Sequence, residues 1–242
     1  MKDLVPFGGD NLISILTAIS LLLPIGAILV RRSMWRWSLA ALVVYYFQFF
    51  LFSFFPENYV STGDQPIQLI QFSHVLIDLP LVLLFMHFFA EDGRTRSRIR
   101  RSLMGWVAWG IILIATMGLT QRITPYLMGP GILLAVAFSV GFFVKHLQSG
   151  IHDRWETGKA FMAGSLVFLY GSYLVIFFIR YVMKLHDEGE TYLLFQVSTL
   201  ISAWLMTAGL ILNRKRPQKR PLDDKARDRN IILTNWGDFQ FK

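Results

Sequence analysis

The sequence predicts an all-α membrane protein whose seven transmembrane helices form one bundle. Hydrophobic residues make up 54% of the 242 residues, whereas soluble domains usually contain about 45–50%. They are concentrated in blocks of about 20 residues, the length that a helix needs to cross the hydrocarbon of a bilayer. The basic residues gather in every second connection between these blocks. The absence of cysteine excludes a disulfide framework, thiolate chemistry and cysteine-bound iron–sulfur clusters.

Seven apolar stretches are the expected spans. In chain order they cover residues 10–31, 37–56, 66–90, 103–121, 124–147, 159–183 and 190–212. The first is too long for the apolar core of a signal peptide and ends in two arginines, so we read it as a span. The connections are short, and the polar stretch AEDGRTRSRIRR (90–101) is expected to be an inner loop. Residues 1–213 are therefore expected to form the bundle, and residues 214–242 a basic cytoplasmic tail.

The distribution of basic residues predicts the orientation of the bundle. Segments 31–36, 94–101, 145–159 and 214–242 together hold 20 of the 24 Lys and Arg residues. These segments share one side, and the positive-inside rule makes that side cytoplasmic. The N-terminus is then outside and the C-terminus inside, as in a protein of the bacterial cytoplasmic (inner) membrane. The net charge of +8 is therefore explained by the basic segments that orient the protein in the lipid bilayer, and a nucleic-acid partner is not needed to explain it.

The third expected span carries polar residues on one helical face. Gln71, His74 and Asp78 follow each other at spacings of three and four residues, which places them on one side of a helix. His74 and Asp78 are close enough for a hydrogen bond. Ionisable groups within a span normally face the bundle interior or a water-filled cavity. Because hydroxyls and amides join helices at lower cost, the His–Asp pair indicates a buried proton-binding site.

Residues of three other spans are expected to close a polar pocket around this pair. Tyr45 of the second span, Tyr170 and Tyr173 of the sixth and Gln196 of the seventh supply polar side chains. The alternative is that such groups only hydrogen-bond the helices together. The remaining histidines, such as His87 and His146, lie near the ends of spans, where His87 is expected at the interface and His146 in solvent.

Part of the sequence resembles the microbial rhodopsins. Residues 66–84, PIQLIQFSHVLIDLPLVLL, look like the third helix of the bacteriorhodopsin family. In that comparison Gln71 occupies the place of an arginine, and His74 the place of the carboxylate that takes the Schiff-base proton. Asp78 occupies the place of a threonine, and Pro80-Leu81 match directly. The resemblance implies a seven-helix bundle around a central pocket.

Two further segments extend the resemblance. YGSYLVIF (170–177) is similar to the retinal wall of the family's sixth helix, and FQVSTLISAW (195–204) to its seventh helix. Leu200 then stands in place of the retinal lysine, and Gln196 in place of a counter-ion. The expected pocket wall comprises Tyr45, Tyr170, Tyr173, Phe177, Leu200 and Trp204, of which the resemblance supplies Tyr170, Tyr173, Phe177 and Leu200. The departure at Leu200 excludes a covalently bound retinal and leaves a non-covalently bound polyene as an option.

The function expected from these features is that of a sensor, a proton- or ion-handling protein or a partner subunit, alone or as a homo-oligomer. No catalytic residue or metal ligand is assigned. One alternative is a haem-b electron carrier, because His74 and His87 lie 13 residues apart on one face and His146 could meet His87. Another is a membrane-embedded metal-dependent hydrolase using His87, Asp92, His146 and His152, although these lack an H-E-x-x-H signature.

Overall fold

The computed structural model describes residues 9–30, 37–52, 65–118, 123–150, 154–184 and 188–213. Within these ranges the regular structure is entirely helical, which confirms the predicted all-α class. The helices are α1 (Gly9–Val30), α2 (Trp37–Phe52), α3 (Gln65–Phe89), α4 (Gly93–Met117), α5 (Thr124–Gly150), α6 (Arg154–Phe177) and α7 (Glu188–Leu212). A π-helical turn, η3 (Phe178–Val182), extends α6.

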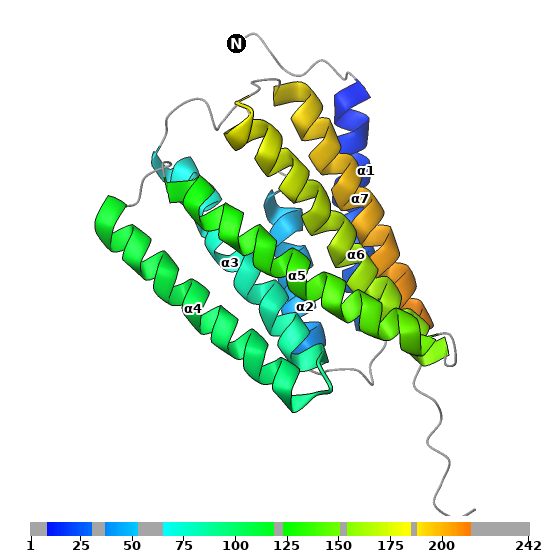
Figure 1. Cartoon of the computed structure of the whole chain (residues 1–242). Helices are drawn as coiled ribbons and strands as arrows, with labels where there is room; N and C mark the ends of the chain where they lie inside the picture. Colours follow the sequence, from blue (N-terminus) through cyan, green and yellow to red (C-terminus); the bar gives the residue numbers. More distant parts are fainter. Residues whose placement is uncertain are drawn as a thin grey trace, which may run out of the picture.

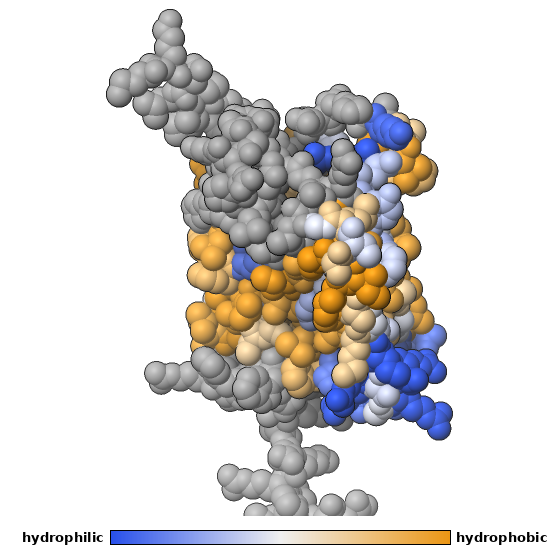
Figure 2. All heavy atoms as spheres, turned by 90° about the vertical axis from the view of Figure 1, so that its left-hand side faces the viewer, coloured by the Kyte–Doolittle hydropathy of each residue, from blue (hydrophilic) through white to orange (hydrophobic). Residues whose placement is uncertain are grey.

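Five described helices are long and apolar enough to cross a membrane, namely α1, α4, α5, α6 with its extension, and α7. The apolar stretches of α2 and of the described part of α3 are shorter, at Leu39–Leu51 and Leu76–Phe89. Large apolar side chains are exposed on the outer surface, where Figure 2 shows a hydrophobic band above a hydrophilic patch. Because exposed apolar surface on this scale is unfavourable in water, these features indicate an integral membrane protein.

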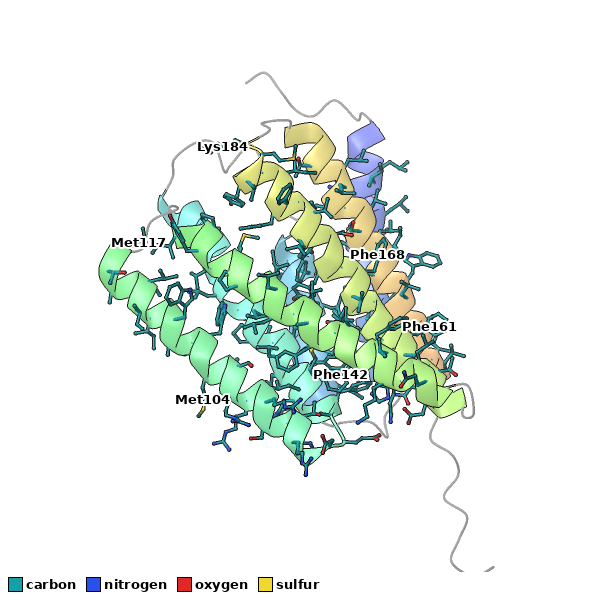
Figure 3. All side chains as sticks on the ribbon, viewed as in Figure 1. Met104, Met117, Phe142, Phe161, Phe168 and Lys184 are labelled. Carbon is teal, nitrogen blue, oxygen red and sulfur yellow. The ribbon has the colours of Figure 1, made fainter. Side chains whose placement is uncertain are left out.

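The helices form one bundle in which consecutive helices are neighbours and α7 returns to pack against α1 (Figure 1). Helix α3 also contacts α5, so it occupies a central position, whereas α4 lies at the edge against α3 and α5. We call the end at which α3, α5 and α7 finish and α4 and α6 begin the lower end, as it is drawn in Figure 1. Met104 of α4 points away from the bundle and is 58% exposed (Figure 3).

The start of α4 corrects one expectation from the sequence. The stretch 90–101 was expected to be a loop, but α4 begins at Gly93 and includes its arginines. The carboxylate of Asp92 accepts hydrogen bonds from the backbone N–H groups of Arg94 and Thr95, and so caps the helix. These bonds, that of Arg94 first, lower the pKa of Asp92. The cap is therefore complete at neutral pH and weakens only as the pH falls through this lowered value.

Glycines bring α6 and α7 into close contact near the lower end. A Cβ atom added to Gly158 would lie 2.6 Å from the backbone nitrogen of Asn213, and one added to Gly209 would lie 2.8 Å from that of Met162. Such distances leave no room for a side chain. Small residues are typical of helix pairs whose backbones approach closely in membranes. We call this contact the glycine seam.

Candidate functional site

Asp78 of α3 lies in a hydrogen-bonded chain that joins three helices. The hydroxyl of Tyr170 on α6 donates to Oδ2 of Asp78 over 3.1 Å. The hydroxyls of Tyr170 and of Tyr45 on α2 are 3.4 Å apart. Both tyrosines are 1% exposed. Asp78 as a residue is partly buried, but its Oδ1 is buried and has no hydrogen-bond partner among the described residues.

The unpartnered oxygen makes Asp78 chemically distinctive. A buried acceptor without a hydrogen bond is costly, so such groups are rare in folded proteins. A proton on Oδ1 removes the charge and turns the oxygen into a donor, and a bound cation would also neutralise it. Protonation of Oδ1 would therefore relieve the cost of leaving this oxygen buried without a partner.

A second set of buried polar contacts connects α6 to α7. The hydroxyl of Tyr173 lies 3.4 Å from that of Thr199, and Ser202 donates to the backbone oxygen of Ser165 over 3.1 Å. Hydrogen bonds of this kind are common between transmembrane helices. The role of these residues is therefore explained by the contact between α6 and α7.

The structure brings only part of the predicted pocket together. Tyr45 and Tyr170 lie with Asp78, as described above, whereas the side chains of Gln71 and His74 lie outside the described residues. The amide nitrogen of Gln196 instead donates to the hydroxyl of Ser14 on α1 over 2.6 Å. Gln196 is therefore used to join α7 to α1.

Three other predicted wall residues take different positions. Trp204 does not line a pocket, because its side chain is 60% exposed and its indole N–H donates to Ser20 on α1. The ring of Phe177 packs against Gly129 of α5, where an added Cβ would lie 3.0 Å from it. Leu200 is partly buried in α7. The position of Trp204 in the seventh expected span does not by itself give the side of α7 on which its side chain lies.

A second polar cluster, which the sequence analysis did not predict, lies at the lower end. Nδ1 of His146 on α5 is 2.6 Å from Oε2 of Glu156 on α6. The ammonium of Lys159, also on α6, donates to Oε1 of Glu156 over 2.8 Å and to Glu91 in the link between α3 and α4. We call these four residues the lower cluster. Together they tie the link between α3 and α4 to the end of α5 and the start of α6.

The lower cluster corrects the expectation that His146 is solvated, because His146 is 2% exposed. The expectation failed because α5 continues to Gly150 and α6 begins at Arg154, so the inner loop is much shorter than expected. His146 and Glu156 lie five residues on either side of Ile151. In two antiparallel helices separated by so few residues, such residues reach the same level. This spacing is the sequence signal that could have identified the pair.

His87 and Asp92, two other residues named for a haem or metal site, have partners in α4. Nδ1 of His87 lies 3.2 Å from the backbone oxygen of Arg96, and Asp92 caps α4. Within the described part of the chain, no group of three His, Asp or Glu side chains has the arrangement of a metal site. The residues named for a haem or metal site therefore have other partners where the structure describes them.

Comparisons with known proteins do not indicate a function for this chain. No protein-family model matches the chain, and neither a curated protein nor a solved structure is significantly similar to it.

Proposed function

We propose that this protein is a seven-helix membrane protein that binds and releases a proton at Asp78. The observation that carries this proposal is the buried carboxyl group, with one oxygen bonded to Tyr170 and the other without a partner among the described residues. An ionisable residue inside a transmembrane bundle is costly and is typically retained for transport or sensing. His74, one helical turn earlier in α3, is proposed to share the proton with Asp78.

The membrane topology proposed with this function follows the basic residues. All seven helices span the bilayer, the N-terminus is outside, and the lower end faces the cytoplasm. The exposed arginines Arg94, Arg98 and Arg100 lie at the lower end of α4, as the positive-inside rule requires. We also propose that the chain is related to the microbial rhodopsins. It would share proton binding with them but have no covalently bound chromophore.

The variants Asp78→Asn and His74→Gln test the proposed function. Each retains size and hydrogen-bonding capacity but removes a group that titrates. With the protein in liposomes, we expect both to abolish the pH dependence of the wild type, measured as proton flux across the bilayer or as tryptophan fluorescence.

Asp92→Asn is the matched control for these variants. It removes an exposed carboxylate but supplies an equally good helix cap, so it should retain the wild-type response. If Asp78→Asn and His74→Gln also retain that response while folding normally, the polar stripe only packs helices together and the proposal is wrong.

A second prediction concerns the chromophore. Adding all-trans retinal to the purified protein is expected to yield no covalently attached, red-shifted pigment. Leu200 supplies no amine, and Lys159 lies at the lower end with its ammonium bonded to Glu156 and Glu91, whereas Schiff-base formation needs an uncharged amine. A visible band that hydroxylamine bleaches, or retinal fixed to the protein by borohydride, would contradict this prediction.

A further inference from the structure

The lower cluster carries charges that do not balance. Ionised Glu91 and Glu156 contribute two negative charges, and Lys159 contributes one positive charge. The side chain of Lys159 is 6% exposed and that of Glu156 18% exposed. A neutral His146, itself 2% exposed, therefore leaves one net negative charge in the lower cluster, in which the side chain of Glu91 alone is mostly exposed, at 61%. Because unbalanced charge is costly next to buried groups, one additional proton on the cluster would offset this charge, against the cost of burying a charged imidazole.

The hydrogen bonds of His146 indicate where this proton goes. Nδ1 lies 2.6 Å from a carboxylate oxygen of Glu156, so this nitrogen carries a hydrogen and donates it. In a neutral imidazole the other nitrogen, Nε2, then holds a free lone pair. Nε2 is buried and makes no hydrogen bond within the described ranges. It is therefore the atom available to accept a proton.

We propose that His146, oriented by Glu156, is a second proton-binding site of this protein. The charged groups that face it are Glu156 and Lys159 of α6 and Glu91 of the link between α3 and α4. Protonation at Nε2 makes this set neutral without breaking the bond from Nδ1 to Glu156. The partly exposed carboxylate of Glu156 and the exposed one of Glu91 connect the site to solvent at the lower end.

Aromatic rings of α3 and α5 line the site. The ring of Phe89, the last residue of α3, lies 5.5 Å from the ring of His146, and Phe142, labelled in Figure 3, stacks on it at 6.0 Å. Asp78 precedes Phe89 by eleven residues in α3, which corresponds to about 16 Å along a helix. Proton exchange at His146 therefore does not require the function proposed for Asp78.

The test is the pH titration of ¹⁵N-labelled histidine in the full-length protein, held in lipid nanodiscs and observed by NMR. The His146 resonances are assigned by their loss in His146→Gln. We expect Nε2 to change from unprotonated to protonated as the pH falls through the range of about 8 to 4, while Nδ1 remains protonated. A constant Nε2 frequency over this range would overturn the proposal.

Two charge-neutralising variants test the role of the carboxylates. Glu156→Gln should lower the midpoint of the His146 titration by roughly one to three pH units, because an opposite charge in contact favours the protonated form. Glu91→Gln alters a side chain that is 61% exposed, so it should fold normally and shift the midpoint in the same direction by less. If neither variant moves the midpoint, the charge argument is wrong.

Asp78→Asn distinguishes this proposal from the proposed function. It should leave the midpoint of His146 unchanged even if it abolishes the pH response of the bundle. A midpoint that moves with Asp78→Asn would show that the two groups form one site, and would overturn the inference of a second one.

Discussion

Replacing Lys159 with methionine is expected to destabilise the protein by about 3 kcal/mol. Removing one partner of a buried ion pair typically costs about 3–5 kcal/mol, because the other charge stays buried and uncompensated. The lower value applies here because the side chains of Glu156 and Glu91 are 18% and 61% exposed, and so retain some hydration. Reversible unfolding in bicelles would measure the loss. At acidic pH the loss of stability should be smaller, because protons bound by the lower cluster cancel the negative charge that Lys159 no longer balances.

Lys184→Met is the matched control for this prediction. Lys184 is exposed at the upper end, where Figure 3 labels it, and exposed substitutions usually change stability by about 0.5 kcal/mol or less. Equal stability losses in the two variants would mean that the bonds of Lys159 to the carboxylates do not stabilise the bundle.

Replacing Gly158 with alanine is expected to destabilise the protein by about 1–3 kcal/mol, the usual cost of overpacking. The new Cβ would lie 2.6 Å from the nitrogen and 2.8 Å from Cα of Asn213. These are backbone atoms, so the two helices must separate to accept the methyl group. Gly209→Ala should behave similarly, because its Cβ would lie 2.8 Å from the backbone nitrogen of Met162.

Gly171→Ala provides the comparison on the same helix. No atom lies within 4 Å of the position that its Cβ would occupy, and alanine is favoured over glycine in helices by about 1 kcal/mol. The variant should therefore be as stable as the wild type or slightly more stable. If Gly158→Ala unfolds like Gly171→Ala in the same bicelles, the glycine seam is less tight than the distances indicate.

The sequence predicted the helices well because hydrophobic length is a strong signal. The seven expected stretches correspond to α1–α7, and most of their ends differ by a few residues. The largest difference is at α4, which begins at Gly93 rather than at residue 103. Its arginines suggest a loop because so polar a stretch does not fit inside a membrane span. Arginine is nevertheless a good helix former, and the cap at Asp92 shows that the helix starts before the apolar stretch.

The candidate site was harder to predict. The spacing of polar residues shows which of them share one face of a helix, but not which other helix that face contacts. The inward position of Asp78 followed from the cost of burying a carboxylic acid, and Tyr170 does bond to it. The partners of Gln196 and Trp204 depend instead on how α7 is rotated against α1. His146 was missed because α5 continues to Gly150 and α6 begins at Arg154, beyond the ends of the apolar stretches.

The glycine seam has a consequence for the order in which this membrane protein assembles. Helices α6 and α7 are consecutive in the chain, and their contact at Gly158 and Gly209 is made largely by backbone atoms. Backbone contact of this kind requires few long side chains to give up their rotamers, so pairing costs little side-chain entropy. Once both helices have entered the bilayer, they can therefore associate as a hairpin without waiting for the other helices. The remaining helices would then pack against a surface that has already formed.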